Sequence, residues 1–139
     1  MYLLDTDILI HLHAGNARVT SCLSELENPD LAIKIITRIE LRRARFDFVM
    51  KATGGNELIR AQQFLSRTEE LLSQLQVIYF DLEAVEIFDR FKSNSRLRKI
   101  VRADCLIASI AMARRATLVT RNIKHFQKFP GLKITNWAV

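Results

Sequence analysis

Five short apolar stretches alternate along the chain with longer segments in which apolar residues recur at helical spacing. The short stretches are YLLD (2–5), LAIKII (31–36), VIYF (77–80), TLVT (117–120) and, more weakly, LKIT (132–135). Runs of this length, rich in Leu, Ile and Val, are typical of strands. Because their apolar residues are consecutive rather than alternating with polar ones, we expect both faces of the sheet to be covered.

The segments between these strands have the pattern of amphipathic helices. The expected helices are residues 6–13, 16–27, 38–52, 57–75, 82–93 and 102–115. Pro29 and Pro130 each lie shortly before an expected strand, where proline ends a helix. Strands that alternate with helices predict right-handed crossovers, and therefore a three-layer α/β/α sandwich around a mainly parallel sheet of four to five strands.

The chain has 139 residues, which predicts a single domain over residues 1–139. With 49% hydrophobic residues and only 4 Gly and 2 Pro, its composition is that of a compact globular protein. Gly54 and Gly55 divide the second helical region into a helical hairpin at about residues 38–75. This hairpin is either a projecting clip over a substrate or partner, or an ordinary helix–helix turn.

Charge and residue usage narrow the classes of partner. The net charge of +6 and the pI near 9.7 favour a polyanion, although many basic proteins bind no nucleic acid. No apolar run approaches the roughly 20 residues of a membrane span, and the N-terminus lacks a signal-peptide pattern, so we expect a cytoplasmic protein without membrane contact. Cys22 and Cys105 have no partner at zinc-ligand spacing and suggest buried, reduced thiols.

Acidic and polar residues follow several of the expected strands. Asp5 ends the first strand, Glu40 follows the second in the first turn of the next helix, and Asp104 begins the helix before the fourth. Thr120 and Asn122 leave the fourth strand at the same edge. Because ligands of open parallel sheets bind outside the carboxyl ends of the strands, we expect these residues to meet at one rim.

Such a cluster of acids predicts a cation. Carboxylates about 4 Å apart repel by roughly 1 to 4 kcal/mol per pair, so they must separate, protonate or bind a positive ion. Oxygen ligands without His or Cys select Mg²⁺ or Mn²⁺, and these ions suit hydrolysis of a phosphodiester. The basic residues around this rim are candidates for binding a polyanion, and they are Arg38, Arg42, Arg98, Lys99, Arg102 and Arg121.

Each acid also has a structural interpretation. Asp5 is suited to cap the helix that follows it, and a first-turn position of Glu40 or Asp104 is favoured by the helix dipole. Asp7 is suited either to orient bound water or to cap the same helix. At the same rim, Asp81 has the position of an N-cap for residues 82–93, so we assign it no catalytic role.

Several linked segments resemble a known family. These are the opening LLDTDILI, the segment TRIEL with Glu40, the helix RADCLIASIAMARRATLVTRN and the ending HFQKFPGLKITNW. Together they are similar, nearly end to end, to a PIN domain of the VapC toxin type.

The resemblance implies a PIN-like fold and a Mg²⁺- or Mn²⁺-dependent endoribonuclease, usually the toxin of a toxin–antitoxin pair. It implies an RNA substrate such as tRNA or another structured RNA, products with a 5′ phosphate and a 3′ hydroxyl, a homodimer, and inhibition by a VapB-type antitoxin. Carried onto this chain, Asp5, Glu40 and Asp104 are the metal ligands and catalytic acids, with Asn122 at the fourth catalytic position and Asp7 and Thr120 in support.

Two positions depart from the family pattern, and other functions stay open. Asp7 stands where the family often has Asn, and Asn122, with His125 beyond it, stands near a common Asp. A neutral fourth position favours one metal over two, and it leaves open a catalytically weakened PIN-like scaffold that binds RNA. A phosphatase with the same acidic rim is also open, whereas the glycine-free turn DTDILI argues against a dinucleotide-binding enzyme.

Overall fold

The computed structural model describes all of residues 1–139 and contains one five-stranded sheet. The strands are β1 (Tyr2–Leu4), β2 (Leu31–Lys34), β3 (Gln76–Ile78), β4 (Thr117–Val119) and β5 (Lys133–Thr135). Their order across the sheet is β3-β2-β1-β4-β5, and every neighbouring pair is parallel. The α/β fold with a mainly parallel sheet is confirmed, and the carboxyl ends of all five strands lie at one edge.

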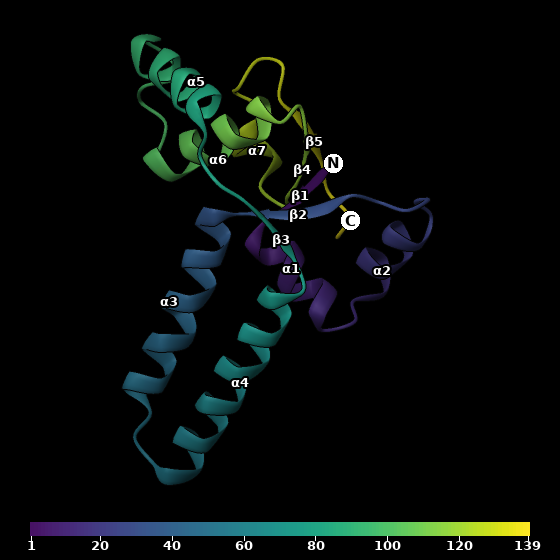
Figure 1. Cartoon of the computed structure of the whole chain (residues 1–139), viewed down its shortest axis with the longest axis vertical. Coiled ribbons are helices and arrows are strands. Elements are labelled where there is room, and N and C mark those ends of the chain that lie inside the picture. The colour runs from purple at the N-terminus through teal and green to yellow at the C-terminus, as the bar shows by residue number, and fades with distance from the viewer.

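Seven helices surround the sheet and form the outer layers (Figure 1). They are α1 (Thr6–His13), α2 (Ala17–Ser24), α3 (Ile35–Lys51), α4 (Gly55–Ser73), α5 (Leu82–Ser93), α6 (Arg102–Ala113) and α7 (Ile123–Phe126). In Figure 1, α5, α6 and α7 lie above the sheet, whereas α1, α2 and most of α4 lie below it. None of these helices is both long and apolar enough to cross a membrane.

Neighbouring residues of the strands enter two different cores, one on each face of the sheet. Leu3 and Leu118 are buried in the core beneath α5 and α6, whereas Leu4 and Val119 are buried in the core beside α1 and α2. Fully burying a side chain of this kind contributes about 1.5–3 kcal/mol relative to exposing it. The consecutive apolar residues of the strands are therefore explained by burial on both faces.

Helices α3 and α4 form a long antiparallel hairpin that extends away from the sheet (Figure 1). The turn between them is held by Glu57, whose carboxylate accepts hydrogen bonds from the backbone N–H of Thr53 at 3.0 Å and from its hydroxyl at 2.9 Å. These bonds favour the charged form and lower the pKa of Glu57. The base of the hairpin lies against the β1–α1 junction, so the hairpin adds a wall beside the carboxyl edge of the sheet.

Some element boundaries differ from the predicted ones. The predicted strand over residues 31–36 ends at Lys34, and α3 begins at Ile35 rather than at residue 38. Ile35 and Ile36 are β-branched, which favours a strand, but in the first turn of α3 they still pack against the core. The sequence pattern does not predict helix α7, because its four residues are too few to show a helical period.

Candidate functional site at the carboxyl edge of the sheet

A cavity of about 150 Å³ lies at the carboxyl edge of the sheet, and we call it the acidic notch. It is lined by the β1–α1 junction, α3, α6, and α7 with its N-cap. Its lining residues are Asp5, Thr6, Asp7, Glu40, Ala103, Asp104, Ile107, Asn122 and Phe126. One cavity is therefore lined by the three acids that were expected to meet, Asp5, Glu40 and Asp104, and by Asp7 and Asn122. These residues are spread over more than a hundred positions of the sequence.

Asp5 is held at the end of β1 by two side chains from neighbouring strands. Its Oδ2 accepts a hydrogen bond from the hydroxyl of Thr120 at 2.9 Å, and its Oδ1 accepts one from the Lys34 ammonium at 3.4 Å. Asp5 occupies the N-cap position of α1, yet its carboxylate makes no capping hydrogen bond to that helix. The carboxylate is thus fixed by β2 and β4 and does not serve as a side-chain cap.

Lys34 is fully buried and is not among the site residues predicted from the sequence. Its ammonium donates to the backbone carbonyl of Leu4 at 3.3 Å as well as to Asp5. Burial lowers the pKa of Lys34, while the nearby charges of Asp5 and Glu40 act in the opposite direction. The only signal in the sequence was the presence of a lysine within the apolar run LAIKII. The run is interpreted as a strand, and this interpretation gives the lysine no separate role.

Glu40 reaches the acidic notch from α3 and is bonded to α1. Its Oε2 accepts a hydrogen bond from the hydroxyl of Thr6 at 2.8 Å. The sequence pattern predicted Glu40 in the first turn of its helix. Because α3 begins at Ile35, Glu40 lies in the second turn instead. The helix dipole favours acidic residues mainly within the first turn of a helix. It therefore does not explain the presence of Glu40 in the second turn of α3.

Asp104 enters the notch from the first turn of α6 and faces His125 on α7. The Nδ1 atom of His125 lies 3.3 Å from Oδ2 of Asp104, and the side chain of Asp104 is 19% exposed. This pairing was not predicted, since it depends on the short helix α7. The sequence had placed His125 beyond Asn122 near the fourth position, and the structure puts its ring nitrogen beside the third acid, Asp104.

The remaining predicted residues have distinct positions around the acidic notch. The buried Thr120 joins two of them, because its hydroxyl donates to Asp5 and accepts from the backbone N–H of Asn122 at 3.1 Å. The side chain of Asn122 makes no capping bond to α7, although it stands at the N-cap position and lines the notch. Asp7 is exposed in the first turn of α1.

The donor set of the notch fits a hydrated divalent cation. No three His, Cys, Asp or Glu side chains are arranged closely enough to hold an ion among them. Asp5, Glu40, Asp104 and Asn122, each with a side-chain oxygen, nevertheless line one small cavity. Mg²⁺ keeps several of its waters and commonly binds only one or two carboxylates directly, so this spacing suits an ion bound partly through water.

The six predicted RNA-binding residues fall into two groups. Arg38 donates to the hydroxyl of Tyr79, Arg42 makes two hydrogen bonds to Glu69, Arg102 stacks over Phe88 and Arg121 lies beside His11. Arg98 and Lys99 are exposed and form no ion pair within the chain. The second group is therefore free to bind an external anion without breaking an existing contact.

A basic cavity adjoins the acidic notch at Asp104 and His125. It measures about 330 Å³, and Arg96, Lys99 and Lys128 line it together with those two residues. The two cavities share Asp104, so positive side chains lie directly beside the acids. This arrangement suits a polyanion whose backbone follows the basic cavity while one of its groups enters the notch.

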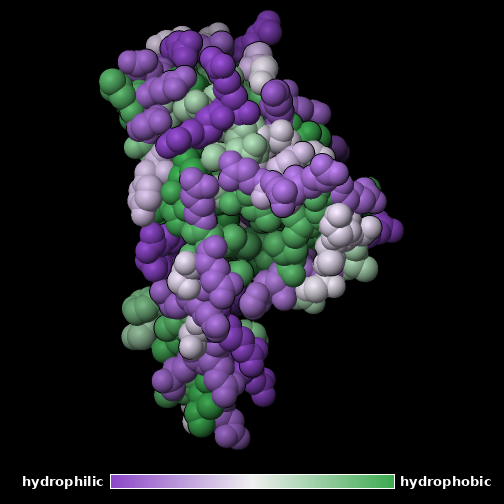
Figure 2. Space-filling view, turned by 45° about the vertical axis from the view of Figure 1, so that its right-hand side comes forward, coloured by the Kyte–Doolittle hydropathy of each residue, from purple (hydrophilic) through white to green (hydrophobic).

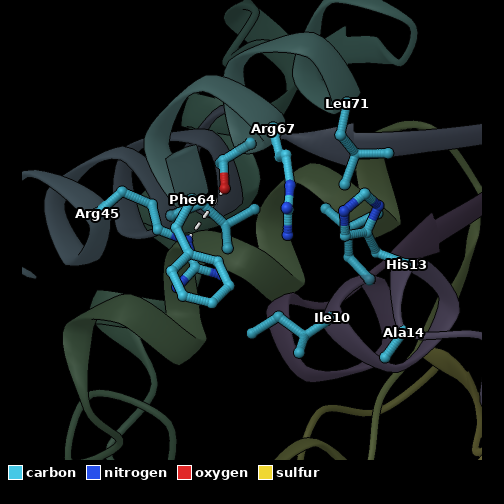
Figure 3. Close-up of a pocket in the computed structure, with 10 residues that line it drawn as sticks. Ile10, His13, Ala14, Arg45, Phe64, Arg67 and Leu71 are labelled. Atoms are coloured by element: carbon cyan, nitrogen blue, oxygen red, sulfur yellow. Dashed lines mark hydrogen bonds between the residues drawn. The ribbon is translucent and has the colours of Figure 1, made fainter. Parts of the chain in front are cut away.

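A separate groove lies between α1, α3 and α4, and we call it the hairpin groove (Figure 3). Its volume is about 190 Å³, and six of its ten lining residues are hydrophobic. Figure 3 shows Ile10 and His13 of α1 on one side and Arg45, Phe64 and Arg67 on the other. The guanidinium groups of both arginines lie over the Phe64 ring, at 5.4 and 5.8 Å, and Arg45 also donates to Thr68 at 3.0 Å.

The sequence and the fold are similar to those of known proteins. The sequence model described as the PIN domain matches residues 2–132. The chain is 31% identical to ribonuclease VapC2 of Rickettsia felis, over 99% of this chain and 98% of that protein. It is 26% identical to ribonuclease VapC1 of Haemophilus influenzae strain R2866, with the same coverage of both chains.

Two solved structures give the same result at the level of the fold. The crystal structure of VapBC2 from Rickettsia felis bound to a DNA fragment from their promoter matches with a TM-score of 0.78 and 28% identity, over 98% of each chain. The crystal structure of FitAcB from Neisseria gonorrhoeae matches with a TM-score of 0.72 and 25% identity, over 99% of this chain and 98% of that one. The similarity therefore includes the helical hairpin as well as the sheet.

Proposed function

Because the chain belongs to the PIN domain family, as its motifs had suggested, we propose that it is an endoribonuclease and the toxin of a VapBC-type toxin–antitoxin pair. The observation that carries this proposal is the meeting of Asp5, Glu40 and Asp104 at one cavity beside a basic one. Similarity to ribonuclease VapC2 over nearly the whole length of both chains supports RNA as the substrate.

The proposed ligands of the divalent cation are Asp5, Glu40 and Asp104, with Mg²⁺ as the expected ion and Mn²⁺ as a substitute. When bound, such an ion activates water and stabilises charge on the attacked phosphate. The chain's own residues fix the ligands: Thr120 orients Asp5, Thr6 orients Glu40 and His125 pairs with Asp104. Asn122 and Asp7 also line the notch, and Asn122 offers a neutral oxygen there.

RNA would enter along the basic cavity, where Arg96, Lys99 and Lys128 face solvent beside the notch. Contacts from these side chains to phosphates would place one phosphodiester at Asp104 while leaving the bases free. Such contacts give affinity without sequence selectivity, so the choice of RNA target would depend on its shape or on contacts elsewhere.

The hairpin groove is the proposed docking site of a VapB-type antitoxin. The similar Rickettsia felis structure is that of VapBC2, so an antitoxin partner is expected here too. The groove has apolar walls that suit one face of a short helix, and it is bordered by Arg45 and Arg67. An acidic residue of the antitoxin could pair with either guanidinium, while an Arg or Lys reaching the acidic notch would pair with its carboxylates.

A homodimer remains a prediction, and exposed apolar side chains offer it a surface. On α3, Ile39, Phe46 and Met50 are between 55 and 67% exposed, and Leu82 at the start of α5 is 74% exposed. Figure 2 shows a further group of hydrophobic residues in the middle of the face that it presents, above the hairpin. Apolar surface of this kind is typical of sites that bind another protein.

The second candidate function is an RNA-binding scaffold with a weakened site. Two observations favour it: the fourth position carries a neutral Asn122, and no three acidic or His side chains form a compact ion-binding cluster. Metal-dependent cleavage separates the two candidates, because a scaffold would bind RNA and leave it intact at any Mg²⁺ or Mn²⁺ concentration.

The test is cleavage of labelled RNA by purified protein with and without Mg²⁺. Asp104→Asn removes one carboxylate charge with little change of shape, so we expect the fold to persist and the cleavage rate to fall at least about a hundredfold. Chelation of divalent ions should abolish cleavage by the parent and leave most RNA binding in place.

The matched control is Asp47→Asn, the same change at an exposed position of α3 that lines neither cavity. This variant should cleave RNA as fast as the parent. Equal rates for Asp104→Asn and the parent would contradict the nuclease assignment, and a requirement for zinc alone would contradict the choice of metal.

A further inference from the structure

Lys34 is the only charged residue among the fully buried ones, and it lies directly behind the acidic notch. Its ammonium contacts two consecutive residues at the end of β1, the Leu4 carbonyl and the Asp5 carboxylate. It also stands at the N-cap position of α3, the helix that carries Glu40. Lys34 therefore links the end of β1, next to Asp5, to the start of α3, the helix that carries Glu40.

Packing alone does not explain a lysine at this position. A buried ammonium loses its hydration, and a methionine of similar length would fill the same space without that cost. What the lysine provides and methionine lacks is a positive charge 3.4 Å from Asp5 Oδ1. The Asp5 side chain is only 13% exposed, so without this charge it would be a nearly buried and poorly compensated anion.

We propose that Lys34 is a positioning residue that acts as a built-in cation of the acidic notch. It fixes Asp5 from behind, together with Thr120, and it offsets one negative charge of the site before any metal binds. Two consequences follow. The metal-free protein keeps Asp5 in place, and the notch binds divalent ions more weakly than its acids alone would allow.

This inference rests on the proposed role of Asp5 as a metal ligand, and its test needs no RNA. Binding of Mn²⁺ to the purified protein is measured by titration calorimetry for the parent and for Lys34→Met. Removing a positive charge from the low-dielectric back of the notch should raise the Mn²⁺ affinity at least about tenfold. A lysine with only a structural role would not produce a gain in affinity.

The matched control is Lys51→Met, which makes the same change of net charge at an exposed position at the far end of α3. Its Mn²⁺ affinity should equal that of the parent, which separates a local charge effect from the general charge of the protein. Unchanged or weaker Mn²⁺ binding by folded Lys34→Met would overturn the proposal.

Stability without metal gives a second and independent readout. In the presence of a chelator, Lys34→Met and Asp5→Asn should each lower the urea midpoint of unfolding, because each leaves the other group buried without its partner. The double variant, which has neither charge, should be more stable than the sum of the two losses predicts. If the two losses of stability are additive, the lysine acts through packing. The same conclusion follows if neither Lys34→Met nor the double variant folds.

Failure of this inference can be told apart from failure of the proposed function. If Lys34→Met binds Mn²⁺ like the parent while Asp104→Asn loses RNA cleavage, the nuclease assignment stands and the role of Lys34 is wrong. If Lys34→Met gains Mn²⁺ affinity while the parent cleaves no RNA, the lysine has the proposed role in a protein with a different function.

Discussion

The acidic notch and the hairpin groove are built in opposite ways. The notch collects side chains from the β1–α1 junction, α3, α6 and α7. Each of its three acids contacts a partner: Lys34 and Thr120 for Asp5, Thr6 for Glu40 and His125 for Asp104. The hairpin groove draws on α1 and on two helices that are neighbours in sequence, and most of its lining residues are apolar. The first holds charges at fixed positions, whereas the second offers surface to be covered.

This difference indicates a division of roles between two regions of the chain. Charges fixed at the edge of a rigid sheet are suited to chemistry, because their positions change little when substrate binds. An apolar groove on a projecting hairpin is suited to a partner, because covering its apolar residues stabilises a complex. Substitutions in the groove should therefore leave RNA cleavage at the notch intact.

The largest expected effect in the groove comes from Phe64→Ala. Phe64 has Arg45 and Arg67 over its ring, so its removal takes away both an apolar wall and the support of two guanidinium groups. We expect binding of a VapB-type antitoxin to weaken by about 2 kcal/mol or more, roughly thirtyfold, as is typical of a central aromatic contact. The dissociation constant is the quantity to measure.

The comparison requires that Phe64→Ala cleave RNA at the parental rate when the antitoxin is absent. Ile59→Ala is the control, because Ile59 is 56% exposed on α4 of the same hairpin and does not line the groove. If both Phe64→Ala and Ile59→Ala bind antitoxin like the parent, the hairpin groove is not the docking site. Loss of cleavage by folded Phe64→Ala would mean that the two regions are not independent.

A smaller effect is expected in the basic surface beside the notch. Replacing Arg96 and Lys99, which line the basic cavity, together by Gln should weaken RNA binding. It should also reduce the slope of log affinity against log salt by about 1.4, or 0.7 for each lost phosphate contact to single-stranded RNA. The control replaces Arg115 and Lys133 by Gln, which removes the same charge at the opposite edge of the sheet, where β4 and β5 begin. Equal slopes for both double variants would place the RNA elsewhere.

The fold and the meeting of the acids could be predicted from sequence because both follow from strand order. Consecutive apolar residues in the strands required cover on both faces, and parallel strands bring the residues after them to one edge. Asp5, Glu40 and Asp104 therefore reached one cavity as expected, although the first helical residue of α3 was misplaced by three positions.

The partners of these acids could not be predicted in the same way. Lys34 lay within an apolar run whose pattern gave no sign of an ion pair across two strands, and His125 depended on a helix of only four residues. The bonds from Arg38 to Tyr79 and from Arg42 to Glu69 depend on how side chains pack between elements distant in sequence. Such contacts follow from tertiary geometry, which local patterns do not contain.

The most direct test of the nuclease and toxin assignment is growth of a bacterial host that expresses either the parent or Glu40→Gln at equal protein levels, without antitoxin. Glu40 is exposed and pairs only with Thr6, so Gln should preserve the fold while removing a charge from the notch. We predict that the parent arrests growth and cuts host RNA, whereas Glu40→Gln does neither. Equal arrest by both proteins, or by neither, would contradict a toxin that acts through these carboxylates.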